Sequence, residues 1–164
     1  MSIFKTSRVK SPWLLHFDCG SCNGCDIEIL ACLTPLYDVE RFGIVNQGNP
    51  KHADIFVVTG AGNPRNARVL KNLYDQMPEP KVVLAIGTCA CSGGIFRDAF
   101  NTKGGVDNII PVDVYVPGCA ARPEAIIDGV VKALGILNDY ENKKKTKKRT
   151  EKTSKKVPVA EEAK

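Results

Sequence analysis

Short apolar runs alternate along the chain with stretches whose apolar residues recur at helical spacing. Runs rich in Val, Ile, Leu and aromatic residues, which are typical of strands, are found at Trp13–Phe17, Ala53–Thr59, Lys81–Gly87 and Val112–Val116, with a weaker candidate at Asp38–Ile44. The run Lys81–Gly87 is almost entirely apolar, as expected of a parallel strand that is covered on both faces.

Helical spacing is clearest between the second and third of these runs. Val69, Leu73 and Met77 fall at positions i, i+4 and i+8. Asn63-Pro64 lies just ahead of them and offers a capping residue followed by a proline at the first helical position. A helix is therefore predicted from about residue 65 to residue 77.

Two further helices are predicted. One contains "DIEILACL", directly after a group of cysteines, and the other begins near Arg122-Pro123. The apolar stripe of the last helix is Ile126, Ile127, Val130, Val131 and Leu134. Gly135 is expected to end it.

Strands that alternate with helices predict an α/β fold with a mainly parallel sheet and right-handed crossovers, and no internal repeat is visible. Such a sheet places functional loops at the carboxyl ends of its strands. The cysteines follow predicted strands in this way: Cys19, Cys22 and Cys25 the first, Cys89 and Cys91 the Lys81–Gly87 strand, and Cys119 the Val112–Val116 strand. Residues far apart in the sequence are therefore expected to meet at one edge.

The length of 164 residues suits a single domain, and the charge of +5 is unevenly distributed. Residues 141–164 hold ten Lys and Arg against four Glu, a surplus of six, which leaves residues 1–140 at −1. The body is nearly neutral, so a nucleic-acid-binding face is not expected. The predicted organisation is an N-terminal extension (1–10), an α/β domain (11–140) and a disordered Lys-rich tail (141–164). A solubilising tail is preferred over one that contacts anionic lipid or an acidic partner.

The N-terminus, "MSIFKTSRVKSPW", shows no export signal, and the apolar runs are too short to span a bilayer. A cytoplasmic location is expected. In that reducing compartment the seven cysteines are not expected to form disulfides, so metal or cluster ligation is the leading explanation.

Spacing narrows the choice of ligands without deciding it. Cys19/Cys22 and Cys22/Cys25 are overlapping C-x-x-C pairs, and Cys89 and Cys119 each lie near a glycine. Such thiolates could hold an iron–sulfur cubane or zinc. Cys19 versus Cys25 and Cys89 versus Cys91 stay open, as does a ferredoxin-type C-x-x-C-x-x-C site. Cys32 lies two helical turns, about 10.5 Å, beyond Cys25 and is expected to be a small buried apolar residue.

Several neighbouring residues have ordinary structural interpretations. Asp26 is expected to cap the helix, and Glu28 to be a first-turn acid that interacts with the helix dipole. Asp18, at the end of the first predicted strand, fits a structural or a functional role equally, and neither is assigned to it. His16 and His52 are expected to be structural or surface histidines.

The loop Gly60-Ala-Gly62 follows a predicted strand and has half of a dinucleotide-binding fingerprint. Arg65 occupies the third glycine position, and no acidic residue stands about 20 residues further on. NAD binding is therefore rejected. The loop is expected to pack against a cluster or a partner subunit.

Three phrases, "CNGCDIEIL", "GTCACSGGIF" and "VPGCAARPEAI", resemble in order and spacing the small subunit of [NiFe] hydrogenases. The membrane-bound, energy-converting (Ech/Mbh-type) group is the most similar, and the likeness covers roughly residues 9–137. The resemblance implies a flavodoxin-like α/β domain with helices on both faces of the sheet. It also implies one proximal [4Fe-4S] cluster, held by Cys22, Cys25, Cys89 and Cys119. The related subunit of respiratory complex I carries adjacent cysteines where this chain has Cys22-Asn-Gly-Cys25, which favours the hydrogenase branch.

The resemblance also implies partners and a role. Large subunits of that family bind nickel and iron through two widely separated C-x-x-C pairs, one near each terminus, and no cysteine of this sequence lies after Cys119. Hydrogen chemistry and the catalytic residues are therefore expected in a partner [NiFe] large subunit. Electrons would pass to a ferredoxin-like subunit with two [4Fe-4S] clusters, which links the complex to soluble ferredoxin. Integral membrane, antiporter-like ion-translocating subunits would hold the complex at the cytoplasmic face of the membrane. Glu28 could be a proton-relay carboxylate.

Two other functions compete with this one. The same fold could serve a complex I-like or sulfane-reductase oxidoreductase. A zinc-stabilised α/β binding module without redox work is the third hypothesis.

Overall fold

The computed structural model describes residue 8 and residues 10–154, with side-chain surroundings as far as Tyr140. The strands are β1 Trp13–Asp18, β2 Val45–Asn46, β3 Ile55–Thr59, β4 Val82–Ile86 and β5 Val114–Val116. The helices are α2 Gly24–Cys32, α3 Pro64–Gln76, α4 Gly87–Ser92 and α5 Pro123–Ser154, and the short 3-10 helices are η1 Val39–Phe42, η2 Gly94–Phe96 and η3 Val106–Asn108. Most of the predicted 1–10 extension and residues 155–164 of the predicted tail lie outside the described residues.

All five strands are parallel and form one sheet in the order β2-β1-β3-β4-β5. This is the flavodoxin-like order, in which the chain changes direction across the sheet between β1 and β3. The predicted α/β fold with a parallel sheet is therefore confirmed. Because every strand runs the same way, all the loops that follow strands leave from one edge of the sheet.

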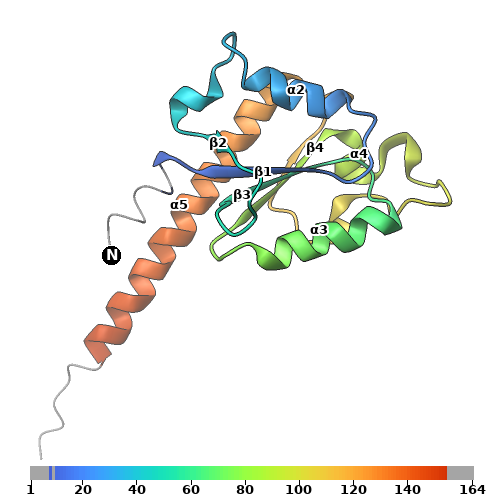
Figure 1. Cartoon of the computed structure of the whole chain (residues 1–164). Helices are drawn as coiled ribbons and strands as arrows, with labels where there is room; N and C mark the ends of the chain where they lie inside the picture. Colours follow the sequence, from blue (N-terminus) through green and yellow to red (C-terminus); the bar gives the residue numbers. More distant parts are fainter. Residues whose placement is uncertain (1–7, 9, 155–164) are drawn as a thin grey trace, which may run out of the picture.

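Helices cover both faces of the sheet, as expected, and α2 and α3 lie on opposite sides of it (Figure 1). Successive residues of a strand point to opposite faces. In β4, Leu84 and Ile86 belong to the core shared with α2 and α5, whereas Val83 and Ala85 belong to the core shared with α3. Two apolar layers therefore hold the sheet between them.

The helix α3 begins where the sequence predicts. The Asn63 side chain accepts a hydrogen bond from the Asn66 N–H at 2.7 Å, and Pro64 is the first helical residue. The predicted apolar stripe is only partly right, because Val69 is exposed and Leu70 is fully buried. The helix is rotated so that Leu70 faces the sheet.

The weak strand candidate Asp38–Ile44 is wrong. Residues Val39–Phe42 form the 3-10 helix η1, and the short strand β2 follows it. Asp38 and Gly43, at the two ends of η1, both have left-handed backbone conformations, with φ of 45° and 83°. Such conformations turn the chain at both ends of the segment and are incompatible with a continuous strand.

The prediction that Gly135 ends the last helix is also wrong. α5 continues through Gly135 to Ser154, so residues 141–154 of the predicted disordered tail are helical (Figure 1). Gly135 does not have the positive φ that would end a helix, and its neighbours Ala133 and Leu137 are fully buried. Packing of these two residues carries the helix past the glycine.

Candidate metal centre

Six of the seven cysteines lie in segments that follow strands at the carboxyl edge of the sheet. Three of them are in the chain that leads from β1 into α2, two are in α4 directly after β4, and one follows β5: Cys19, Cys22, Cys25, Cys89, Cys91 and Cys119. Because β1 and β4 flank β3 and β5 adjoins β4, the parallel sheet brings these segments to a common rim.

Four of the sulfurs interact with one another electrostatically. Burial raises the pKa of the Cys89 thiol, and the charges of Cys119, Cys22 and Cys25 raise it further. Burial is likewise the main cause that raises the pKa of Cys25, to which the charges of Cys22 and Cys119 add. Thiols that influence one another in this way lie close together. Since Cys22 and Cys119 are exposed, the group opens toward solvent or a partner.

Glycines allow the backbone to approach these sulfurs. A Cβ atom added to Gly87 would collide with the Cys25 sulfur, and one added to Gly94 would come within 3.2 Å of the Cys89 sulfur. Both glycines also have positive φ, 87° and 54°, which side chains rarely allow. The space around the thiols therefore depends on the absence of side chains at these two positions.

Backbone hydrogen bonds join the segments of the rim. The Thr88 N–H donates to the Gly118 carbonyl at 2.9 Å, which ties α4 to the loop that carries Cys119. The backbone of Ala121 donates a hydrogen bond to Cys25, which lowers the pKa of that thiol and partly offsets its burial. N–H groups directed at sulfur stabilise a thiolate and anything anionic that the thiolate binds.

Cys91 and Cys19 have different surroundings from these four thiols. The Cys91 S–H donates to the Ala85 carbonyl at 3.7 Å, so its sulfur is directed back toward β4, although it lies near Cys25 and Cys89. Cys19 is fully buried in the core beneath α3, and burial, followed by the charge of Asp18, raises its pKa to about 11. Both sulfurs face the interior of the domain.

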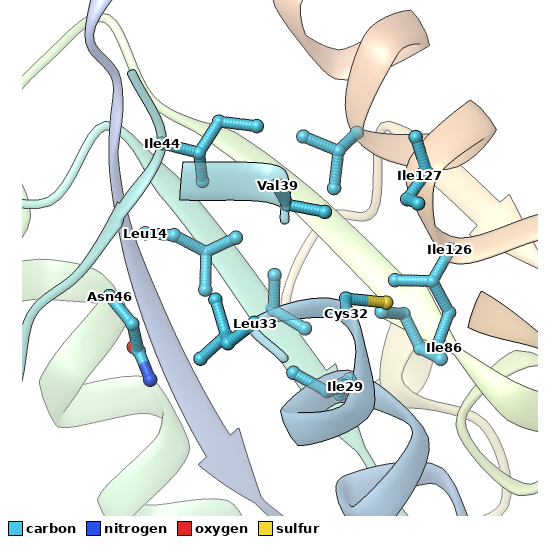
Figure 2. A pocket seen from close by; sticks show the side chains of 12 residues that line it. Leu14, Ile29, Cys32, Leu33, Val39, Ile44, Asn46, Ile86, Ile126 and Ile127 are labelled. Atoms are coloured by element: carbon cyan, nitrogen blue, oxygen red, sulfur yellow. The ribbon is translucent and has the colours of Figure 1, made fainter. Parts of the chain in front are cut away.

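Cys32 lies at the C-terminal end of α2, two helical turns beyond Cys25. Figure 2 shows its sulfur beside Ile86 and Ile126. These residues and Ile29 help to line an apolar cavity of about 30 Å³. The S–H donates to the Glu28 carbonyl at 3.3 Å, and burial raises the pKa of the thiol to about 11. The prediction that Cys32 is a buried apolar residue is confirmed.

Within the described ranges, 8 and 10–154, no three His, Cys, Asp or Glu side chains converge on a position where a single metal ion could bind. Thiolates that hold a cubane do not need to converge in this way, because each one binds a different iron atom. A group of four neighbouring thiols with glycine-lined space around it fits the ligand requirements of such a cluster.

Asp26 does not cap α2, which corrects the sequence prediction. The residue before the helix is Asn23, in a left-handed conformation with φ of 66°, and Asp26 lies in the first turn. Its carboxylate accepts hydrogen bonds from the Ser21 and Thr59 hydroxyls and lies 2.8 Å from His16 Nε2. Sequence reasoning missed this group because its members come from separate elements and no motif links them.

Glu28 is not a first-turn residue, because α2 already begins at Gly24. Its side chain is half-buried, and its carbonyl accepts the hydrogen bond from Cys32. Asp26 is the acidic residue of the first turn. The dipole interpretation of Glu28 is therefore wrong, and its proton-relay role stays a prediction.

The glycine loop after β3 packs on the cysteine segment, and its packing against a cluster or a partner subunit stays a prediction. The Gly62 N–H donates to the Cys19 carbonyl at 3.1 Å, and a Cβ on Gly60 would lie 2.6 Å from the Ser21 nitrogen. Asp18 holds the same segment, since its Oδ1 accepts the N–H groups of Gly20 and Ser21 at 2.8 and 2.6 Å.

His52 has a structural place, as predicted, because its ring lies 5.5 Å from that of Trp13. His16 also contacts protein groups, but through the carboxylate that follows Cys25 in sequence. Among the described residues, the structure contains no helix with the length and apolar character needed to span a bilayer.

The fold and the thiol-lined rim define an α/β domain with a candidate metal centre at the carboxyl edge of its sheet. The chain belongs to the family of the NADH ubiquinone oxidoreductase 20 kDa subunit, whose family model matches residues 22–133. Members of this family are iron–sulfur subunits of hydrogenases and complex I.

Three similar proteins show where the chain lies within the family. It is 54% identical over 128 residues to the probable membrane-bound hydrogenase subunit mbhJ of Pyrococcus furiosus, covering 78% of this chain and 77% of that protein. It is 47% identical over 131 residues to an NADH-quinone oxidoreductase subunit of Desulfovibrio desulfuricans, covering 80% and 69%. Among solved structures, a chain of the membrane-bound sulfane sulfur reductase, an archaeal respiratory membrane complex, matches with a TM-score of 0.73 and 40% identity, covering 84% and 76%. These relatives confirm the resemblance to membrane-bound hydrogenase and complex I-like subunits.

Proposed function

We propose that this chain is the electron-transfer small subunit of a ferredoxin-dependent, membrane-associated [NiFe] hydrogenase. The ligands of its single [4Fe-4S] cluster are assigned to Cys22, Cys25, Cys89 and Cys119. The observation that carries this proposal is the position of these four thiols, all in segments that follow parallel strands at one edge of the sheet. The 54% identity to a membrane-bound hydrogenase subunit supports the hydrogenase branch.

When bound, such a cluster accepts and releases one electron at a time, which suits a relay between a nickel–iron site and a ferredoxin-like subunit. The residues of this chain hold, enclose and polarise the site. Gly87 and Gly94 leave room beside the Cys25 and Cys89 sulfurs. The Ala121 N–H donates to Cys25, and bonds of this kind help to set the reduction potential.

Partners would complete the enzyme. A [NiFe] large subunit would supply the catalytic centre, since we assign no catalytic residue to this chain. A ferredoxin-like subunit with two [4Fe-4S] clusters would exchange electrons with soluble ferredoxin, and antiporter-like membrane subunits would translocate ions. This chain would then lie peripherally at the cytoplasmic face of the membrane.

Exposed apolar residues near the rim support a covering partner. Ile27 and Leu30 on α2 are 64% and 55% exposed, and Ile95 and Phe100 after α4 are 90% and 101% exposed. Large apolar side chains grouped on a surface mark interaction sites. A large subunit that docks over these two segments would also shield the thiols from water.

We assign to Glu28 a proton-relay role beside the metal centre. Its half-buried carboxylate lies one helical turn after Cys25, on the helix that leads away from the rim. Glu28→Gln keeps the size of the side chain but removes the titrating group. Turnover of the complex is expected to fall roughly tenfold or more while iron content and cluster spectrum stay unchanged. Unchanged turnover would leave Glu28 with a structural role only.

A second candidate function is favoured by the structural match to the sulfane sulfur reductase chain. In that case the same electron relay would serve a sulfur substrate in place of hydrogen. The large subunit distinguishes the two functions: two intact C-x-x-C pairs indicate hydrogen chemistry, and their loss indicates the alternative.

The test is purification of the native assembly, followed by analysis of iron, zinc and acid-labile sulfide and by assay of hydrogen evolution from reduced ferredoxin. Iron and sulfide in equal amounts, with hydrogen evolution, would support the proposal. Zinc without sulfide would show a structural metal site. A cluster without hydrogen evolution but with reduction of sulfane sulfur would support the second candidate.

A further inference from the structure

The carboxylate of Asp26 is held by side chains from three different segments. The Thr59 hydroxyl, at the end of β3, donates to Oδ1 at 2.7 Å. His16 Nε2, on β1, lies 2.8 Å from the same oxygen, and the Ser21 hydroxyl, in the cysteine segment, donates to Oδ2. The Asp26 side chain is 13% exposed and Thr59 is fully buried, so this group belongs to the interior of the rim.

Both oxygens of the Asp26 carboxylate are engaged by neighbouring side chains: Oδ1 accepts from Thr59 and lies beside His16, and Oδ2 accepts from Ser21. Hydrogen bonds of this kind favour the charged form of a carboxylate. The geometry therefore fixes the position of a carboxylate within the rim.

This carboxylate adjoins a thiol of the rim. Asp26 is the next residue after Cys25 in the first turn of α2. A negative charge fixed beside a sulfur disfavours the addition of an electron to a group that the sulfur binds, because the electron increases the negative charge at the same place.

An acidic residue in the first turn of a helix needs no such arrangement to interact with the dipole. The three side-chain contacts go beyond that role because they fix the direction of the carboxylate. They also fasten the start of α2, directly after Cys25, to His16 of β1 and Thr59 of β3. The bond to Ser21 also holds the residue directly before Cys22. The same residue thus orients the cysteine segment and places a charge beside it.

We propose that Asp26 is a positioning residue that anchors the Cys22–Cys25 segment to the sheet and lowers the reduction potential of the metal centre. This inference rests on the proposed function, since it needs a redox-active cluster at these thiols. Neutralising the carboxylate should make reduction easier. The expected change in the reduction equilibrium is on the order of tenfold, which corresponds to about 59 mV for one electron.

The test is a redox titration of the purified complex, followed by the paramagnetic signal of the reduced cluster. Asp26→Asn keeps the size of the side chain and one acceptor oxygen but removes the charge, and it is expected to raise the midpoint potential. Asp75→Asn, which removes an exposed carboxylate on α3, is the matched control and is expected to leave the potential unchanged. An unchanged potential in Asp26→Asn would overturn the inference.

A second variant keeps the inference testable if Asp26→Asn fails to retain the cluster. Thr59→Val preserves the charge and the shape of the core but removes one hydrogen bond that orients the carboxylate. It is expected to raise the potential by a smaller amount, and a wild-type potential in this variant would overturn the inference. Absence of the cluster from the wild-type complex would instead overturn the proposed function.

Discussion

Cysteines at the rim and cysteines inside the domain differ in what surrounds their sulfurs. Cys22 and Cys119 are exposed and interact with other thiols, whereas Cys19 and Cys32 are 0% and 4% exposed and lie among apolar side chains. The pKa of each interior thiol is raised to about 11, mainly by burial. The comparison teaches that the role of a cysteine here depends on whether its sulfur faces the rim or an apolar core.

The largest effect is expected from the removal of a rim thiol. Cys119→Ser is expected to abolish the paramagnetic signal of the reduced cluster and to lower hydrogen evolution on the order of 100-fold or more, because a ligand is lost. Spectroscopy and activity of the purified complex measure both effects. Cys32→Ala serves as the control and should retain both. Full iron and sulfide content in Cys119→Ser would show that this thiol is not a ligand.

Filling the space beside a rim thiol should have the next largest effect. Gly87→Ala places a Cβ against the Cys25 sulfur and demands a left-handed alanine, at a cost of about 2 kcal/mol in the free energy of unfolding. Iron content should fall together with thermal stability. Gly48→Ala is the matched control, because a Cβ at that position meets no atom within 4 Å. Normal cluster content in Gly87→Ala would contradict the proposed tight enclosure.

Removal of the interior thiols should affect folding but not the metal centre. Cys19→Ala and Cys32→Ala each leave a small gap in a packed core, which is expected to cost about 1 kcal/mol in the free energy of unfolding. Thermal melting and iron analysis of the same preparations separate the two effects. Loss of the cluster in Cys19→Ala would show that the rim and interior groups have been divided wrongly.

The smallest expected effect concerns pH. In the folded protein Cys19 and Cys32 keep their protons up to a pKa of about 11, whereas the reference value is 9.0. Their stabilising contribution is therefore complete below about pH 9 and is lost as the pH rises toward 11. Melting temperatures measured across this interval should fall, and less steeply in the double variant Cys19→Ala/Cys32→Ala. Identical slopes of melting temperature against pH in the two proteins would show that the burial of Cys19 and Cys32 does not contribute to the pH dependence of stability.

Much of the fold follows from local pattern. The strands β1, β3, β4 and β5 were predictable because fully covered parallel strands read as apolar runs, and α3 because Asn63-Pro64 has the chemistry of a helix start. The rim itself followed from the rule that parallel strands all end at one edge.

The predictions that were wrong concern features that depend on contacts between distant residues. No local feature distinguishes Gly135 from a terminating glycine, and only the burial of Leu137 explains why α5 continues. In the same way, the burial of Leu70 in place of Val69 could not be predicted without the orientation of α3 on the sheet.

The place of the cysteines could be predicted better than that of their supporting groups. Spacing brought six cysteines to one edge and left Cys32 inside, as the structure has it, but it did not choose between Cys19 and Cys25 or between Cys89 and Cys91. That choice follows from the resemblance and stays a prediction. Asp26 was interpreted as a cap because capping is the commonest role for an aspartate at a helix start. Its actual partners, His16 and Thr59, lie on two neighbouring strands, and only the folded sheet brings them to it.

The length of α5 keeps the Lys- and Arg-rich part of the helix far from the thiols at the rim. Lys143 is the first of seven Lys and Arg residues between positions 141 and 154, and it follows Pro123 by about 30 Å of helix. In physiological salt the field of a charge fades over roughly 8 Å. Lysines can therefore be gained or lost along the far end of this helix with little effect on the electrostatic potential at the thiols.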